Sequence, residues 1–287
     1  MKFGIIGTGV VGTALAVRLE QVGHECIGVH SRNEEAYQRF CKYLNKDHLS
    51  LESLVPRVDM LFITTQDGMI RQVAEELTAR GLVIPNQLWV HCSGSLSSQV
   101  LRVEEDAAVK CLSIHPLQTF ANVSEALKLL PGTHYGVEGE AQAIGEQLVQ
   151  DLGGIAHCLT ATNKTSYHAG AVVASNFLVV LAVYAVQLFA QAGISSEDAL
   201  EALLPLMKGT LHNLGEVGIP RALTGPIARG DIDVVRGHLK QLSTQQAEIY
   251  RVLGAVALEL GQAKWRLDGL VYPQEALQEI KVLLSLS

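Results

Sequence analysis

Three glycines near the start of the sequence constrain the fold more than any other feature. Gly7, Gly9 and Gly12 form a GxGxxG pattern that follows an apolar β-type run, Phe3–Ile6, and opens a segment with helical spacing, Gly12–Val22. This order of strand, glycine turn and helix is typical of a Rossmann βαβ unit that binds a dinucleotide. The first glycine permits a tight turn, the second lets the backbone approach a pyrophosphate, and the third lets the helix pack on the strand.

We predict that the cofactor contacts this turn and the residues that follow the next strands. The predicted cofactor-binding residues are Gly7, Thr8, Gly9, Val10, Val11, Gly12, Ser31, Arg32, Thr64, Thr65, Gln66 and Ser93. In open α/β sheets, ligands bind beyond the carboxyl ends of the strands, and several of these residues stand directly after an apolar run. Small polar residues also suit ordinary turns, which is the alternative interpretation.

The residues after the second β-type run indicate which dinucleotide binds. NAD enzymes usually place an acidic residue there, about 20 residues beyond the glycines, to bind the ribose hydroxyls. This chain instead has Ser31 and Arg32, with no carboxylate at the end of the run. Because a guanidinium binds phosphate through several charge-assisted hydrogen bonds, we predict NADP as the cofactor. The alternative is that Ser31 and Arg32 only cap the next helix.

Short apolar runs alternate with helical segments up to about residue 160. The further β-type runs are Cys26–Val29, Met60–Thr64, Leu88–His91, Val109–Ile114, Tyr135–Val137 and Ile155–Leu159. This alternation predicts an α/β fold: an N-terminal Rossmann domain, residues 1–160, with a doubly wound, mainly parallel sheet.

The rest of the chain, residues 161–287, predicts an all-helical C-terminal domain. Its first segment, Lys164–Ala192, is apolar on almost every side and predicts one long helix at the centre of a bundle or at a dimer interface. We therefore expect a homodimer. The further helical segments are Ser196–Gly209, Asp231–Gln241, Thr244–Leu260 and Gln274–Leu284.

Composition excludes several classes of function. The formal net charge of −7 argues against a nucleic-acid partner, which would need a basic face. The five cysteines are widely spread without a CxxC pair, so we expect no metal site and no disulfide framework. No signal-peptide pattern follows Met1, and the apolar run Phe177–Val186 is shorter than the about 20 residues of a membrane span. We expect a cytoplasmic protein with a small-molecule substrate and no membrane partner.

Several motifs together give the chain a resemblance to a known group. They are the glycine turn, Thr64–Asp67, Ser113–Gln118, Tyr167–Ala169 followed by Ser175–Asn176, and Ala222–Asp231. On these residues the chain resembles the Rossmann-like proteins that carry a DUF2520 C-terminal domain. They belong to the superfamily of 6-phosphogluconate and β-hydroxyacid dehydrogenases, ketopantoate reductase and pyrroline-5-carboxylate reductase. The resemblance implies an NADP-type oxidoreductase fold with a helical second domain, often dimeric, and it supplies no substrate.

The catalytic residues of that superfamily are only partly matched here. In the β-hydroxyacid dehydrogenases, a Lys and an Asn four residues apart on the first long helix of the second domain serve catalysis. In this chain Val172 holds the place of that lysine, and we expect Lys164 to be solvated. We predict His168 and Asn176 on the long helix, and His115 at the end of a strand, as catalytic residues. The alternatives are a hydrogen-bonded core role for His168 and a backbone partner for Asn176.

The sequence thus predicts an NADP-dependent oxidoreductase that transfers a hydride to or from a C=O or C=N bond of a small metabolite. The metabolite is expected between the two domains, with His168 or His115 handling the proton. The alternative is a non-catalytic NADP-binding dimeric protein, which the departure from the lysine pattern favours.

Overall fold

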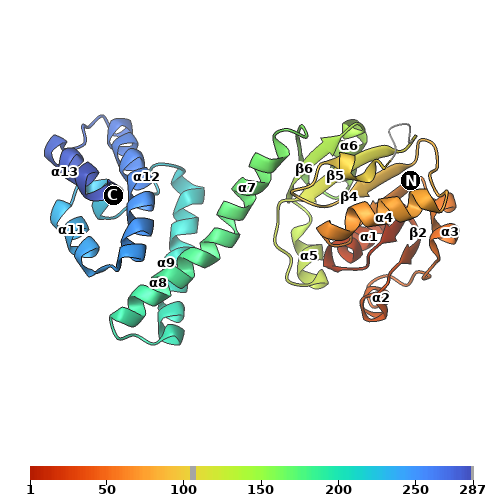
Figure 1. Cartoon of the computed structure of the whole chain (residues 1–287), viewed down its shortest axis with the longest axis horizontal. Helices are drawn as coiled ribbons and strands as arrows, with labels where there is room; N and C mark the ends of the chain where they lie inside the picture. The colour runs from red at the N-terminus through yellow and green to blue at the C-terminus, as the bar shows by residue number, and fades with distance from the viewer. Residues whose placement is uncertain (104–107, 286–287) are drawn as a thin grey trace. The chain divides into compact units, whose positions relative to one another are not determined.

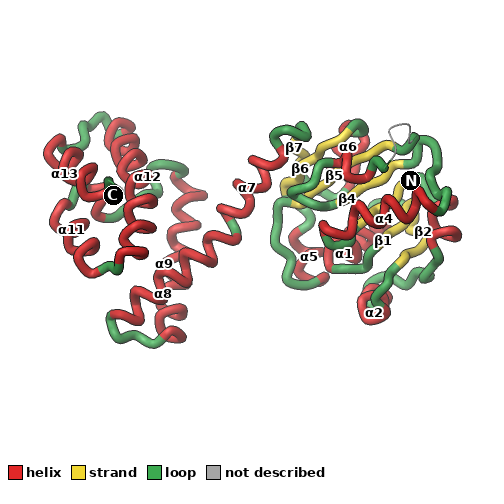
Figure 2. The backbone as a smooth tube through the Cα atoms, in the orientation of Figure 1, coloured by secondary structure: helices red, strands yellow, loops and turns green. Residues whose placement is uncertain are grey.

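The computed structural model describes residues 1–103 and 108–285 and forms two compact units, Met1–Val179 and Val180–Ser287. The first unit contains a sheet with flanking helices, and the second contains helices joined by loops (Figures 1 and 2). The boundary between the two units falls inside the helix α8, Asn176–Gln191. The domain division into residues 1–160 and 161–287 stays a prediction.

A seven-stranded sheet in the order β2-β1-β3-β4-β5-β6-β7 forms the first unit. The strands are β1 Lys2–Ile6, β2 Glu25–His30, β3 Met60–Ile63, β4 Leu88–His91, β5 Lys110–Pro116, β6 His134–Gly139 and β7 Ile155–Cys158. Neighbouring strands pair in parallel except β5 and β6, which are antiparallel. Every run predicted as a strand forms one, so the predicted α/β fold with a mainly parallel sheet is confirmed.

Helices cover both faces of this sheet. They are α1 Val10–Gln21, α2 Glu34–Cys41, α3 Leu51–Leu54, α4 Asp67–Ala79, α5 Val123–Leu129 and α6 Gln142–Asp151. One apolar cluster joins the sheet to α1, α5 and α6, and a second joins its other face to α3 and α4. Strand neighbours divide between them, with Phe62 in the first cluster and Leu61 in the second, because side chains alternate along a strand. The loops that follow β1, β3, β4 and β5 are left at one edge.

The segment predicted as one long helix, Lys164–Ala192, is instead two. They are α7, Lys164–Ala174, and α8, Asn176–Gln191, with a break at Ser175, whose φ is −110°. By length and composition, the stretch Lys164–Gln191 would also pass as a membrane span, although the shorter run within it would not. One such stretch is weak evidence, because apolar helices of soluble proteins pass the same test.

The second unit is helical beyond α8. Its helices are α9 Ser196–Val217, α10 Pro226–Arg229, α11 Ile232–Gln241, α12 Thr244–Leu267 and α13 Gln274–Leu284. The amino terminus of α12 is fixed by a capping box, in which Ser243 and Gln246 each hydrogen-bond the other's backbone N–H. Its core gathers Ile227, Val235 and Leu258 with α13 residues such as Ile280. The predicted helical C-terminal region is therefore confirmed.

The motif Ala222–Asp231 forms a loop and the short helix α10 in this unit. Trp265 Nε1 donates a hydrogen bond to the Ala228 carbonyl oxygen at 2.9 Å, and Tyr272 Oη donates to that of Ile227 at 2.5 Å. Arg229 forms an ion pair with Asp231 at 2.7 Å. Side chains from α12 and the loop after it therefore hold this motif in place.

Candidate functional site

The glycine turn has the geometry that each of its glycines was predicted to provide. Gly7 has φ +102°, and a Cβ there would lie 2.9 Å from the carbonyl oxygen of Thr64. A Cβ on Gly12 would overlap the Thr64 hydroxyl and the Gly7 carbonyl oxygen. A Cβ on Gly9 would meet nothing within 4 Å, so this residue faces open space at the start of α1. The turn thus leaves room for a group in front of unpaired helix N–H groups.

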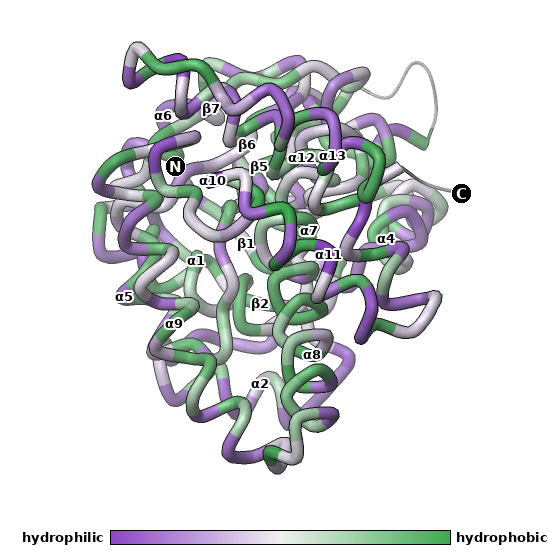
Figure 3. The backbone as a smooth tube through the Cα atoms, turned by 90° about the vertical axis from the view of Figure 1, so that its left-hand side faces the viewer, coloured by the Kyte–Doolittle hydropathy of each residue, from purple (hydrophilic) through white to green (hydrophobic). Residues whose placement is uncertain are grey.

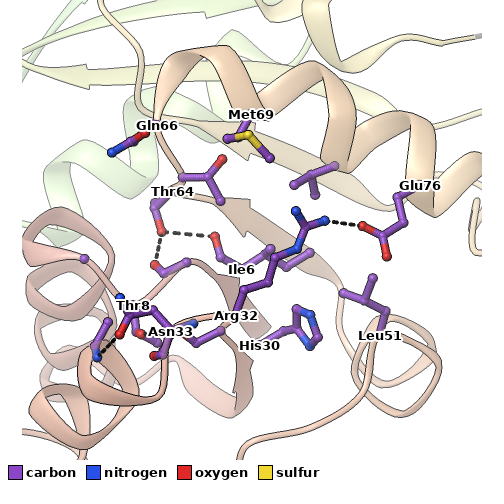
Figure 4. Close-up of a pocket in the computed structure, with 16 residues that line it drawn as sticks. Ile6, Thr8, His30, Arg32, Asn33, Leu51, Thr64, Gln66, Met69 and Glu76 are labelled. Atoms are coloured by element: carbon purple, nitrogen blue, oxygen red, sulfur yellow. Dashed lines mark hydrogen bonds and ion pairs between the residues drawn. The ribbon is translucent and has the colours of Figure 1, made fainter.

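A cavity of about 300 Å³ lies between this turn, the end of β2 and helix α4 (Figure 4). Its lining residues are Ile6, Gly7, Thr8, Gly9, His30, Ser31, Arg32, Asn33, Ala36, Leu51, Thr64, Thr65, Gln66, Met69, Val73 and Glu76. Most residues predicted to bind the cofactor are among them. Val10, Val11 and Gly12 lie in the first turn of α1, where both valines pack against the core.

The residues after β2 form one wall of the cavity. Ser31 Oγ accepts a hydrogen bond from Thr8 Oγ1 at 2.9 Å and so joins this loop to the glycine turn. The cap of α2 is Asn33, whose side chain accepts from the Ala36 N–H. Arg32 points across the cavity and forms an ion pair with Glu76 of α4 at 2.6 Å (Figure 4). Arg32 therefore belongs to the cavity and not to the helix cap.

The residues after β3 form the floor of the cavity. Thr64 Oγ1 donates to the Gly7 carbonyl oxygen at 2.7 Å and ties β3 to the turn. Thr65 Oγ1 is buried and has no hydrogen-bond partner within the described residues. An orphaned buried hydroxyl is costly, so its place in this cavity favours a polar ligand group beside it. Together with the open space at Gly9, this fits a dinucleotide.

Ser93, which was predicted to contact the cofactor, does not line this cavity and instead supports the loop after β4. It is 5% exposed, and its hydroxyl donates to Asp67 Oδ2 at 2.6 Å. Ser93 Oγ also accepts hydrogen bonds from the N–H groups of Ser95 and Leu96. The structure therefore uses Ser93 to fix the loop that precedes the histidine cluster.

His115 and His168 come together next to that loop. His115, on β5, shares a 3.0 Å hydrogen bond between its Nδ1 and the Tyr167 hydroxyl, and its ring lies 5.9 Å from that of His168. The Nδ1 of His168 is buried without a partner in the described part of the chain. A Cβ on Gly94 would lie 2.5 Å from His168 Nδ1 and 2.8 Å from His115 Nε2. Glycine at this position therefore lets both rings approach the β4 loop.

These rings border a second cavity of about 650 Å³ within the first unit. Its lining residues are His115, Leu117, Gln118, Thr119, Tyr167, His168, Gly170, Ala171, Val172, Ala174, Ser175, Asn176, Leu178 and Val179. All three predicted catalytic residues are in this set. Asn176 is exposed at the start of α8, so its side-chain amide does not need a buried backbone group as a hydrogen-bond partner. The lining combines imidazole, phenol, hydroxyl and amide groups with apolar side chains.

Lys164 is buried, and the expectation that it would be solvated was wrong. It is 1% exposed, and its ammonium donates a hydrogen bond to Ser113 Oγ on β5. Ser113 Oγ in turn donates to the Ser93 carbonyl oxygen at 3.3 Å. Burial lowers the pKa of Lys164 to about 8. No ion pair of Lys164 is found among the described residues, although the charges of Glu138 and Asp67 partly offset the effect of burial on its pKa.

Burial and Lys164 also determine the charge of the neighbouring histidine. The pKa of His115 is lowered to about 4, first by burial and then by the Lys164 charge. His115 is therefore neutral at pH 7. Sequence reasoning missed Lys164 and did not weigh Tyr167 as a site residue. The available signal was spacing, because Lys164 and His168 stand one helical turn apart.

Comparison with known proteins agrees with this architecture. Residues 1–116 match the model of a Rossmann-like domain, and residues 133–257 match the domain of unknown function DUF2520. No curated protein matches the chain in sequence.

Solved structures share the fold over most of the chain. A Thermotoga maritima protein is 23% identical with a TM-score of 0.69, over 91% of this chain and 99% of its own. A Bacteroides fragilis protein provisionally named an NADP oxidoreductase is 23% identical with a TM-score of 0.67, over 90% and 98%. A reductive aminase from Aspergillus terreus, solved with NADPH and ethyl levulinate, is 18% identical with a TM-score of 0.55, over 99% and 92%.

Identities this low establish a shared fold and leave the reaction to be argued from the site. The two family models cover adjoining parts of the chain in the order that the motifs predicted. The chain therefore carries a Rossmann-like domain followed by a DUF2520 domain.

Proposed function

We propose that this chain is an NADP-dependent oxidoreductase that transfers a hydride to or from a C=O or C=N bond of a small metabolite. One observation carries the proposal: a glycine-turn cavity and the cluster of His115, Tyr167 and His168 lie at the same edge of one sheet. Ligands of open α/β sheets bind at that edge. The reductive aminase of the same fold was solved with NADPH, which supports a nicotinamide cofactor here.

Several residues of the first cavity would hold the dinucleotide. The turn around Gly9 and the amino terminus of α1 suit the pyrophosphate, and the Thr65 hydroxyl offers an unused hydrogen bond. Ser31 and Arg32, with no carboxylate at the end of β2, suit a 2′-phosphate. When bound, the dinucleotide supplies or accepts the hydride. The histidine cluster then exchanges the accompanying proton with the substrate.

A spectrophotometric screen tests the proposed reaction. Purified protein is incubated with NADPH and a panel of aldehydes, ketones and cyclic imines, and the loss of the NADPH absorbance band is followed. Turnover of at least one compound is expected, and it should vanish when His168 and His115 are both replaced. Tight NADPH binding without turnover across the panel would instead favour a non-catalytic NADP-binding protein.

Arg32→Ala is expected to remove most of the preference for NADPH over NADH. The wild-type protein should bind NADPH at least about tenfold more tightly, which corresponds to about 1.4 kcal/mol, because the guanidinium contacts the 2′-phosphate. Isothermal titration calorimetry of both cofactors measures the ratio. Arg39→Ala, at an exposed arginine of α2 outside the cavity, is the control. Equal affinities of the wild-type protein for NADPH and NADH would refute the assignment.

The exposed apolar side chains of α8 support a further part of the proposal, a soluble cytoplasmic homodimer in which a second copy covers this helix. Phe177, Val179, Val180, Leu181 and Val183 are 40–65% exposed, and α8 is coloured mostly as hydrophobic in Figure 3. Contiguous apolar patches of this kind on soluble proteins usually mark an interaction site.

Val183→Glu is expected to halve the molar mass in solution. A buried carboxylate without a partner would oppose the pairing of two α8 helices. Light scattering coupled to size exclusion at micromolar concentration gives the mass. Val282→Glu, at a 71% exposed valine of α13, changes the same residue type elsewhere and should leave the dimer intact. A monomeric wild-type protein would contradict the proposed assembly.

A further inference from the structure

Arg32, the residue proposed to bind the 2′-phosphate, is engaged by a carboxylate from the opposite wall of its own cavity. Its NH2 group lies 2.6 Å from Glu76 Oε2. Arg32 comes from the loop after β2 and Glu76 from α4, so the ion pair bridges the two walls (Figure 4). The Arg32 side chain is 60% exposed and that of Glu76 is 26% exposed. The arginine is therefore open to solvent and to a ligand, while the carboxylate is more enclosed.

Glu76 is held by a second arginine. Its Oε1 accepts a hydrogen bond from Arg80 NH2 at 2.6 Å, and Arg80 NH1 donates to Glu52 Oε1 at 2.7 Å. The four side chains form an alternating row of two guanidinium groups and two carboxylates, whose formal charges cancel. Consequently, Arg32 presents little unneutralised positive charge to a ligand phosphate.

We infer that Glu76 competes with the 2′-phosphate for the Arg32 guanidinium and thereby limits the preference of the cavity for NADP over NAD. The inference rests on the proposed function, because it assumes that Arg32 binds the phosphate. A 2′-phosphate beside Arg32 lies close to the Glu76 carboxylate, and like charges repel at that range. To bind the phosphate bidentately, Arg32 has to give up at least part of its contact with Glu76.

The contribution of Glu76 to fold stability is only a weak explanation for its position beside Arg32. Ion pairs between partly exposed side chains contribute about 0–1 kcal/mol, and Arg80 keeps its contact with Glu52 when Glu76 is neutral. The position of Glu76 inside the cavity lining is therefore better explained by an effect on the ligand. Weaker binding of the 2′-phosphate would let NAD as well as NADP bind and would speed the dissociation of NADP.

Glu76→Gln tests this inference through binding alone. Calorimetry compares 2′,5′-ADP with 5′-AMP, and NADP⁺ with NAD⁺, in the full-length protein. The variant should bind 2′,5′-ADP and NADP⁺ about fivefold more tightly, as expected for removing one partly screened charge. Its affinity for 5′-AMP and NAD⁺ should stay nearly constant. The gain should shrink as salt is added, because salt screens the repulsion.

Glu75→Gln is the matched control, since it removes the same charge one residue away. Glu75 forms an ion pair with Arg71 at 2.8 Å and does not line the cavity. Both affinities should remain at their wild-type values. An unchanged or weaker 2′,5′-ADP affinity in Glu76→Gln, while Arg32→Ala does weaken it, overturns the inference and leaves the NADP assignment standing. If Arg32→Ala has no effect on 2′,5′-ADP, both fall.

Discussion

Gly12→Ala is expected to lower the free energy of unfolding by about 1–3 kcal/mol and to abolish dinucleotide binding, because the added methyl group has no space. Its carbon would overlap the Gly7 carbonyl oxygen and the Thr64 hydroxyl. The first is backbone, and the second is held by a hydrogen bond to that same backbone. Neither can rotate away, so α1 has to separate from the turn that it supports.

Gly9→Ala separates binding from stability. A Cβ on Gly9 would meet nothing within 4 Å, and its φ of −70° is accessible to alanine. This variant should unfold like the wild-type protein and yet lose NADPH affinity, because the methyl group occupies the space expected for the pyrophosphate. Gly68→Ala, in the first turn of α4 with the same open surroundings, should affect neither property. Thermal melts and calorimetry give both quantities. Equal stability of all three variants would contradict the packing role of Gly12.

The sheet could be predicted from the sequence because its central strands, β1, β3, β4 and β5, are buried on both faces. Such strands appear as short, continuous apolar runs bounded by polar residues, and all seven runs form strands. The helix Gln274–Leu284 also has the predicted bounds. The short helices α3, α5 and α10 were not predicted, since segments of one or two turns carry little periodicity. The break at Ser175 was missed because an apolar pattern continues through it.

The candidate site could be predicted only where its signal is local. The glycine turn and Arg32 are readable from spacing and residue type. The burial of Lys164 depends on Ser113, which is 51 positions away, and the pairing of Arg32 depends on Glu76, 44 positions away. Such contacts follow from the order of the strands. For the same reason the sequence selected His115 and His168 separately, while their approach over Gly94 required the structure.

His168→Ala is expected to lower turnover by about 10²- to 10⁴-fold while leaving NADPH affinity nearly intact, the range typical of a general acid–base group. His168 borders the larger cavity together with His115. The pKa of His115, lowered to about 4, keeps that ring neutral between pH 5 and 8. A neutral imidazole can accept a proton during alcohol oxidation, but it has no imidazolium proton to donate during carbonyl reduction. His115 is therefore a poor proton donor for the reductive direction, and the predicted role of His168 is tested by its replacement.

Comparison of His168→Ala with His115→Ala tests this assignment in both directions of the reaction. In carbonyl reduction at pH 7, the first variant should lose much more rate than the second. A third variant, Lys164→Met, tests the electrostatic effect of the ammonium separately from a role in packing. Without the ammonium, the pKa of His115 should rise, because the Lys164 charge helps to lower it. Any acid limb of the pH–rate profile that depends on neutral His115 should then move to higher pH. Normal reduction by a folded His168→Ala protein would transfer the role to His115 or remove it from both histidines. Failure of that variant to fold would instead indicate a core histidine.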